Sequence, residues 1–281
     1  MSALGALLAP RSESGATGMR SRILLGLVCA GYSVGAALGW GSPQVALFMG
    51  DFGLAAAALV AAVSCFLYAR TGAGRLRPAW MLFSLSSLMA ACGNAVWGWY
   101  EVILGVPVPT PSLADVFFLC FAPPAIIGLL VLAKRPVTRA GWVCLALDAW
   151  LIGGSLLTLA WSLALAHTAH TAHMAGFQDT SVAPAALSLA YPLLDIVLVS
   201  MVLALHFRRV GVNRSAVNTA IAALALTVLS DAVFTSPLLR STYHSGQLLD
   251  AGWFAGSLLL AYAPWGARRG VRRPPRPGAP G

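Results

Sequence analysis

The chain has 281 residues, of which 58% are apolar or aromatic and only 10% are charged, whereas an average soluble domain is about 45–50% apolar and about 25% charged. So few charged residues cannot cover the surface of a soluble protein of this length, which excludes an ordinary water-soluble enzyme. The formal net charge of +9 accompanies a mean hydropathy of +0.78, so the basic residues do not indicate a nucleic-acid partner. We expect lipid to be the solvent of most of the chain.

Long apolar runs predict membrane-spanning helices, because backbone polar groups must be paired inside hydrocarbon and a helix pairs them within one segment. We therefore predict an all-α, polytopic integral membrane helix bundle with about eight transmembrane helices, in the cell membrane. The predicted spans are 22–40, 46–69, 79–103, 114–133, 141–166, 183–207, 216–236 and 250–266. The predicted domains are an N-terminal tail (1–21), the transmembrane domain (22–266) and a basic Pro/Gly-rich tail (267–281).

The positions of the basic residues predict the orientation, because Lys and Arg beside spans are retained in the cytoplasm. Seventeen of the 18 Lys and Arg residues fall on one side of an eight-span path, and only Arg240 falls on the other. Both termini are therefore predicted to be cytoplasmic. Residues 1–18 carry no span pattern and Met19 precedes another plausible start, so we expect this stretch to be a tail or a misassigned translation start.

Several acidic residues fall inside the predicted spans, where an ionisable group is costly and commonly marks a ligand or ion pathway. Apart from Arg22 at the first position of the first span, no Lys or Arg lies within a span to neutralise them, and all except Asp148 and Asp195 are expected toward the outer face. The acids are Asp51, Glu101, Asp115, Asp148, Asp195, Asp231 and Asp250. The candidate residues of an intramembrane polar or ligand pocket are Asn94, Glu101, Asp115, Asp148, Tyr191, Asp195, Asp231 and Asp250.

Helical spacing places some of these residues on shared faces. Tyr191 and Asp195 are i, i+4 neighbours, and Thr227 and Asp231 repeat that spacing. In the third span, small and polar residues at three- and four-residue steps predict one face that points into the bundle. That face consists of Ser87, Ala91, Asn94, Gly98 and Glu101.

Three interpretations of the polar groups stay open. They hydrogen-bond one helix to another and only specify packing, or they line a cavity open to the outer leaflet that binds a small molecule or a lipid headgroup, or they carry protons or ions. For Asp115 a structural role is sufficient, because Ser112 and Asp115 fit a capping box in which Asp replaces the usual Glu.

The remaining motifs do not predict catalysis. His167, His170 and His173 form HxxHxxH in an outer loop, which is compatible with metal binding or pH sensing but also with a solvated loop. The five cysteines lie inside predicted spans without a CxxC pair. No nucleotide-binding glycine loop, HExxH or GxGD motif occurs. We expect no catalytic residues, no bound metal and no cofactor.

An ordered set of motifs resembles the membrane-embedded N-terminal segment of actinobacterial GGDEF/EAL proteins. The motifs are ADVFFL, LDAWL, AYPLLD, LSDAVF and LLDAGW, over roughly residues 80–266. The positions that match the family pattern are Asp115, Asp148, Tyr191, Pro192, Asp195, Asp231, Asp250 and Trp253. The resemblance brings no ligand role with these residues, and it implies a sensory or anchoring segment in a cyclic-di-GMP signalling system.

The catalytic GGDEF and EAL domains of that family are absent from this chain, which ends in an Arg/Pro/Gly-rich tail. Three explanations stay open: a truncated or frameshifted gene, a stand-alone sensor that docks a separate partner, or a gene annotated short. We expect a sensory or anchoring membrane domain without its own catalysis, whose candidate partners are membrane lipid, a small-molecule signal at the outer side, a cytoplasmic signalling protein and a second copy of the chain. The alternative is a small-molecule or proton-coupled transporter.

Overall fold

A computed structural model describes residues 13–71, 73–109, 111–132, 147, 191, 193–200, 214–234 and 243–271. Within these ranges every regular element is helical, which confirms the all-α prediction for this part of the chain. Asp148, the histidine motif and, except for Leu147, the predicted fifth span lie outside the described residues. Of the predicted sixth span, the structure describes Tyr191 and residues 193–200.

Four helical stretches in the described residues are long and apolar enough to cross a membrane, which indicates a membrane protein. Their bounds agree within a few residues with the predicted spans 46–69, 79–103, 114–133 and 216–236. The stretches are Pro43–Thr71, Arg77–Leu104, Leu113–Val131 and Ser215–Phe234. The full number of eight spans and the cytoplasmic position of the termini stay predictions.

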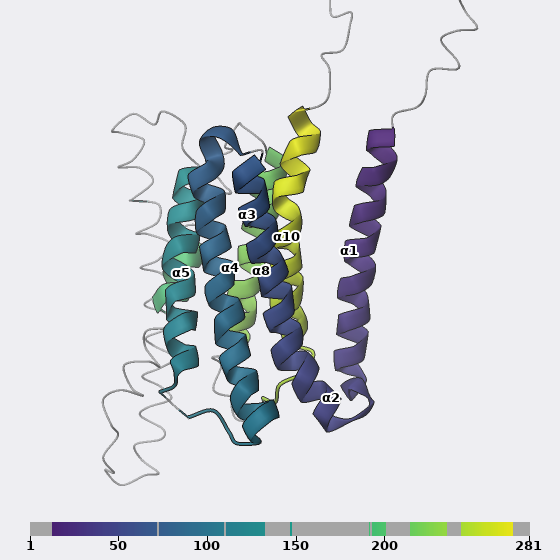
Figure 1. Cartoon of the computed structure of the whole chain (residues 1–281), viewed down its shortest axis with the longest axis vertical. Coiled ribbons are helices and arrows are strands. Elements are labelled where there is room, and N and C mark those ends of the chain that lie inside the picture. Colours follow the sequence, from purple (N-terminus) through teal and green to yellow (C-terminus); the bar gives the residue numbers. More distant parts are fainter. Residues whose placement is uncertain are drawn as a thin grey trace, which may run out of the picture.

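Two further helices lie alongside these four (Figure 1). Helix α1 (Glu13–Ala37) begins before the predicted start at residue 22, and no proline between Pro10 and Pro43 interrupts it. Helix α10 (Asp250–Val271) begins at the predicted position.

The chain turns sharply after α1. In η1 (Gly39–Gly41) three consecutive residues have positive φ, and Trp40 is the one that is not glycine, with φ 54°. Two contacts hold Trp40 in this unfavourable conformation: its ring lies edge-on to Tyr32 and its Nε1 donates to the Gly246 carbonyl at 3.1 Å. Helix α2 (Pro43–Phe48) then starts with Ser42 as N-cap, whose Oγ accepts from the Val45 amide.

The remaining helices form the bundle in Figure 1. Helix α2 continues through the π-helical turn η2 (Met49–Gly53) into α3 (Leu54–Thr71), and η3 (Gly74–Leu76) leads into α4 (Arg77–Gly98) and the π-helical segment η4 (Trp99–Leu104). Helix α3 packs between α4 and α10, α4 packs on α5 (Leu113–Leu132), α8 (Arg214–Phe234) packs on α10, and α1 packs on α10.

Most of the buried residues of α3 are small, and large apolar residues cover its outer side. Ala57, Ala61 and Cys65 of α3 are buried, and Ser64 Oγ donates to the Ala261 carbonyl of α10 at 2.6 Å. On the outer side of the same helix, Val60 is 53% exposed. Small residues let helix backbones approach closely in a bilayer, and exposed aliphatic side chains suit a lipid solvent.

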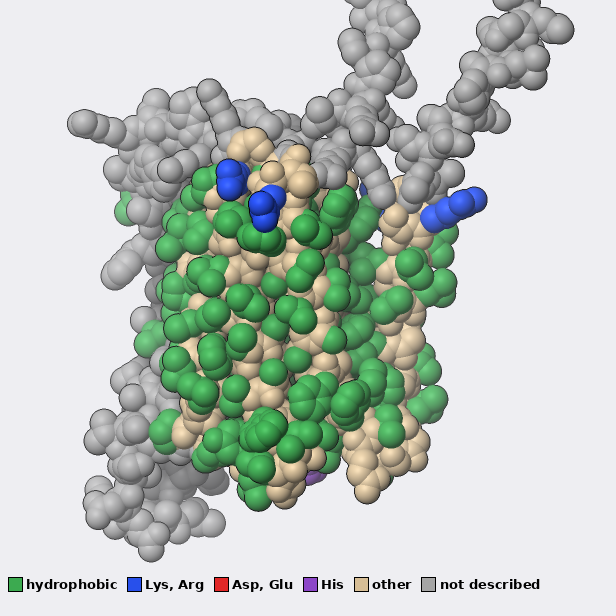
Figure 2. Space-filling model, viewed as in Figure 1, with side chains coloured by type: hydrophobic (Ala, Val, Ile, Leu, Met, Phe, Trp, Pro, Cys, Tyr) green, Lys and Arg blue, Asp and Glu red, His purple; other side chains and the backbone are tan. Residues whose placement is uncertain are grey.

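The two ends of the bundle differ in charge. Arg20, Arg70 and Arg77 lie where α1 begins and where α3 leads into α4, and Figure 2 shows blue side chains at that end above a broad hydrophobic surface. We call this the arginine end. The opposite end, where α2, η2, η4 and the start of α10 meet, carries Asp51, Glu101 and Asp250 and is called the carboxylate end. The described residues of the carboxylate end include no Lys or Arg.

Candidate functional site

Two π-helical turns deliver acidic residues to the carboxylate end. Asp51 lies in η2, directly before the long apolar helix α3, and Glu101 lies in η4, directly after α4. A π-helical turn inserts an extra residue into an α-helix, shifts the side chains that follow to another face and is frequent at functional sites. The third acid, Asp250, is the first residue of α10.

The segment from Tyr243 to Leu249 folds over these acids. Gly50 and Gly246 face each other so closely that a Cβ on either residue would overlap backbone atoms of the other segment, and Gly246 has φ +92°. Gly98 likewise lets α4 approach η2 closely, because a Cβ there would lie 2.9 Å from the Asp51 Cβ. The three glycines therefore bring η2, α4 and the 243–249 segment together around the carboxyl groups.

Hydrogen bonds fix two of the three carboxyl groups. Glu101 Oε2 accepts from Ser245 Oγ at 2.8 Å. Asp250, fully buried, accepts from the Tyr243 hydroxyl at 2.8 Å and from the Gly246 amide at 2.6 Å. Burial and the neighbouring Asp250 carboxylate raise the pKa of the Tyr243 hydroxyl well above its usual range, so Tyr243 stays a neutral donor.

Asp51 is the exception in this cluster. Its side chain is 3% exposed, it faces Ser245, Glu101 and Asp250, and its Oδ2 has no hydrogen-bond partner in the described structure. A buried polar atom without a partner is costly and calls for an explanation such as a ligand or water that fills the place.

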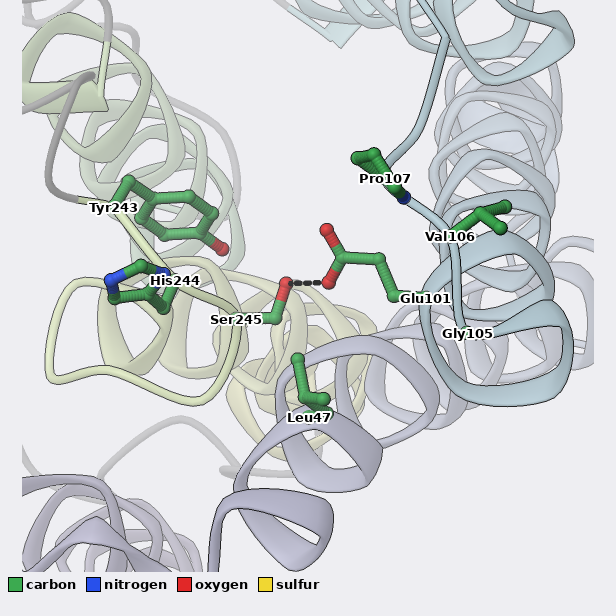
Figure 3. Close-up of a pocket in the computed structure, with 8 residues that line it drawn as sticks. All are labelled: Leu47, Glu101, Gly105, Val106, Pro107, Tyr243, His244 and Ser245. Atoms are coloured by element: carbon green, nitrogen blue, oxygen red, sulfur yellow. Dashed lines mark hydrogen bonds between the residues drawn. The ribbon is translucent and has the colours of Figure 1, made fainter.

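A pocket of about 230 Å³ opens beside the cluster (Figure 3). Glu101 points into it from η4 toward Ser245 on the opposite wall, and Tyr243 and Leu47 lie on either side. The η4 segment ends at Gly105, whose φ of +64° turns the chain and brings the following residues to the pocket rim. The lining residues are Leu47, Glu101, Gly105, Val106, Pro107, Tyr243, His244 and Ser245.

A second polar group lies between α8 and α10. Trp253 Nε1 donates to Asp231 Oδ1 at 2.7 Å, and the carboxyl group of Asp195 is a neighbour of Asp231. The Trp253 ring also contacts the Tyr243 ring, with centroids 6.3 Å apart. Trp253, one of the positions that match the family pattern, is thus a half-buried hydrogen-bond donor to Asp231.

Asp115 forms a third group at the start of α5. Its Oδ2 accepts from the Ser112 amide at 2.7 Å, which confirms the predicted contact between the two ends of the capping motif. Its Oδ1 accepts from the Tyr191 hydroxyl at 2.6 Å. Both oxygens of Asp115 are therefore satisfied by protein groups.

Asn94 belongs to none of these groups, because its Nδ2 donates to the Ala90 carbonyl of the same helix at 2.9 Å. Ser87, Ala91 and Gly98 are buried, as the predicted inward face of this helix requires. Among the predicted pocket residues that the structure describes, Glu101 and Asp250 share the carboxylate-end cluster, and Asn94, Asp115, Tyr191, Asp195 and Asp231 lie elsewhere. Asp148 lies outside the described residues.

Sequence reasoning placed Ser245, Gly246 and Tyr243 in no site. Their role depends on a contact between segments 144 residues apart, Glu101 with Ser245. The only local signal is the Ser-Gly pair before Asp250, which is typical of a turn.

Comparisons of the chain with protein families, with curated proteins and with solved structures found no match. The resemblance to the membrane segment of GGDEF/EAL proteins therefore stays a prediction. Among the described residues, no group of three or more His, Cys, Asp or Glu side chains is arranged to hold a metal ion.

Proposed function

We propose that this chain is a membrane-embedded sensory domain that binds a small ligand in the pocket at the carboxylate end. The observation that carries the proposal is the link between the pocket and α10. Tyr243 lines the pocket and donates to Asp250, and Asp250 is the first residue of α10. A ligand that displaces Tyr243 therefore acts directly on the start of α10.

Helix α10 extends from this link to the arginine end (Figure 1). Its interior face packs on α3 and α8 through small residues such as Ala261 and Gly256. In the proposal, the carboxylate end faces outward and both termini are cytoplasmic, so α10 carries the signal across the membrane. The ligand must bind one packing of α10 more tightly than another, and a tenfold preference corresponds to about 1.4 kcal/mol.

We assign the domain to a cyclic-di-GMP signalling system on the strength of the sequence resemblance. Because this chain carries neither a GGDEF nor an EAL motif, its output requires a separate cytoplasmic protein or a domain encoded downstream. An anchoring role without a ligand is the alternative within this assignment, and it predicts that the pocket acid Glu101 is dispensable.

The test is a gene deletion complemented with variants. We expect the deletion to change the cellular cyclic-di-GMP content and the wild-type chain to restore it. Glu13→Gln is the matched control and should also restore it, because Glu13 is the only other glutamate and lies away from the pocket, at the start of α1. Glu101→Gln at equal membrane expression should not restore it. Full restoration by Glu101→Gln would favour anchoring, and an unchanged cyclic-di-GMP content in the deletion strain would contradict the assignment.

A proton-coupled transporter is the second candidate, and the pair Asp195 and Asp231 favours it. The two carboxyl groups are neighbours inside the helices, and intramembrane acids are common in proton relays. Proton flux driven by a substrate in proteoliposomes, abolished by Asp231→Asn, would support transport. If loss of the chain alters the cellular cyclic-di-GMP content and no such proton flux is found, the results support the sensory function.

A further inference from the structure

Helix α1 is packed against the bundle mainly near the carboxylate end. Between residues 18 and 31 no side chain of α1 is buried, whereas Tyr32 and Ala36 are 4% and 7% exposed. Toward the arginine end an exposed hydrogen bond of 3.2 Å, from Arg22 Nε to the Tyr262 hydroxyl, joins α1 to α10. Figure 1 shows α1 at the edge of the bundle. An element with few buried contacts separates from its neighbours easily, so the position of α1 depends on the contacts around Tyr32.

Those contacts form one aromatic unit at the end of α1. The Tyr32 ring stacks on Phe254 of α10, with centroids 3.9 Å apart, and the Tyr32 hydroxyl donates to the Met49 carbonyl of η2 at 2.9 Å. The Trp40 ring lies edge-on to Tyr32, with centroids 5.1 Å apart. It also fills the space beside Gly35, where a Cβ would lie 2.5 Å from a Trp40 ring carbon. Helix α1 and the turn that follows it are therefore packed together through Trp40.

Trp40 also contacts the chain that forms one wall of the pocket. Its Nε1 donates to the Gly246 carbonyl at 3.1 Å, and the three residues before Gly246, 243–245, all line the pocket. The Gly246 amide donates to Asp250 at the start of α10. A displacement of the pocket wall therefore reaches Trp40 through the peptide of one residue.

The backbone of Trp40 is in an unfavourable conformation. Its φ of 54° lies between those of Gly39 and Gly41, which are 66° and 77°. A non-glycine residue stays in this region only where surrounding contacts hold it there. When the hydrogen bond to Gly246 opens, Trp40 loses one of these contacts and is expected to relax to negative φ. Such a change redirects the chain between α1 and α2, and it moves the weakly packed part of α1 most.

We propose that Trp40 is a latch that couples the pocket to α1. In its closed position, which the structure shows, it holds α1 against α10 and holds the 243–249 segment over the pocket. An occupant of the pocket that shifts Gly246 opens the latch, so that α1 moves as well as α10. This inference rests on the proposed function in that it concerns the regulation of the same pocket. Coupling between two sites is reciprocal, so a weakened latch also loosens the pocket wall.

The first measurement follows the position of α1 by the distance between two spin labels. It uses the full chain in lipid nanodiscs, with the five native cysteines replaced and labels at Leu24 of α1 and Leu67 of α3, which are 63% and 47% exposed. Trp40→Phe removes the indole N–H, and Gly35→Ala displaces the Trp40 ring. In both variants we expect the distance distribution to broaden and to shift to longer distances.

Each variant has a matched control. Gly31→Ala lies one turn before Gly35 on α1, where a Cβ meets no atom within 4 Å, and Trp99→Phe changes a residue of η4 that is 55% exposed. Both controls should keep the wild-type distance. A second label pair within the bundle, at Leu67 and Leu85, should keep its distance in every variant, which separates opening of the latch from unfolding.

The second measurement follows the pocket wall without spin labels. Ser245 is 5% exposed, so in the variant Ser245→Cys the thiol should react slowly with iodoacetamide. Addition of Trp40→Phe or Gly35→Ala should raise this rate by about tenfold, because the loss of one hydrogen bond of typical strength shifts an opening equilibrium by roughly that factor. Gly31→Ala should leave the rate unchanged.

Three outcomes would overturn the inference: α1 keeps its distance in both latch variants, the controls move α1 as far as the latch variants do, or α1 moves while the reaction rate at position 245 stays the same. These assays contain no ligand and no signalling component. Opening of the latch without any effect of the gene on cyclic-di-GMP would contradict the proposed function alone. A signalling effect of Glu101→Gln together with an α1 that the latch variants do not move would contradict this inference alone.

Discussion

Gly246 supports the whole carboxylate end through its backbone. Its amide donates to Asp250, its carbonyl accepts from Trp40, and its φ of +92° is a conformation that L side chains rarely adopt. A Cβ would also overlap the Ala46 carbonyl of α2. One residue without a side chain thus joins the turn after α1, helix α2 and the start of α10.

Gly246→Ala should therefore destabilise the protein by about 1–3 kcal/mol through backbone strain, and by more if the contact with Ala46 does not relax. The measurement is the midpoint of thermal unfolding, followed by tryptophan fluorescence in nanodiscs. Gly26→Ala is the matched control, because a Cβ at Gly26 in α1 meets no atom within 4 Å. Equal midpoints for the two variants would show that the backbone contacts at Gly246 do not hold this end together.

Helix α3 shows what the sequence could predict about an element and what it could not. The apolar run of α3 predicted a membrane span, and the regular spacing of small and polar residues in α4 predicted that Ser87 and Ala91 face inward. Both predictions depend only on the local pattern of the sequence. The π-helical turns before α3 and after α4 have no comparable signal. They arise where the helices meet other segments, so the faces of Asp51 and Glu101 could not be derived from an α-helical period of 3.6 residues.

The contact between α3 and α10 depends on small side chains. Ala61 is fully buried at this interface, next to the Ser64 and Cys65 contacts with carbonyls of α10. Ala61→Leu should lower stability by about 1–3 kcal/mol, because the added carbon atoms have no space and push the helices apart.

The control for this prediction is the adjacent residue. Val60 is 53% exposed on the outer side of α3, so Val60→Leu should leave the unfolding midpoint within experimental error. If Ala61→Leu were tolerated equally well, α3 and α10 would not be in close contact, and the proposed route of the signal along α10 would lose its packing partner.

At the scale of the whole molecule, the described helices separate charge along the bundle axis. Arg20, Arg70 and Arg77 lie at one end, and Asp51, Glu101 and Asp250 lie at the other. The sequence predicted this separation because each span carries the chain from one side to the other. It did not predict that the acids divide into separate groups, since that depends on contacts such as Tyr191 with Asp115 and Trp253 with Asp231.

The same separation makes the orientation testable by cysteine labelling. In a background with all five native cysteines replaced, we expect a cysteine at His244, which is exposed at the carboxylate end, to react with a membrane-impermeant maleimide in intact cells. A cysteine at Thr71, exposed at the arginine end, should react only after the membrane is permeabilised, because flanking arginines are retained in the cytoplasm. The reverse pattern would place the pocket in the cytoplasm. That result would contradict a sensor of external signals, because a ligand outside the cell would no longer reach Glu101.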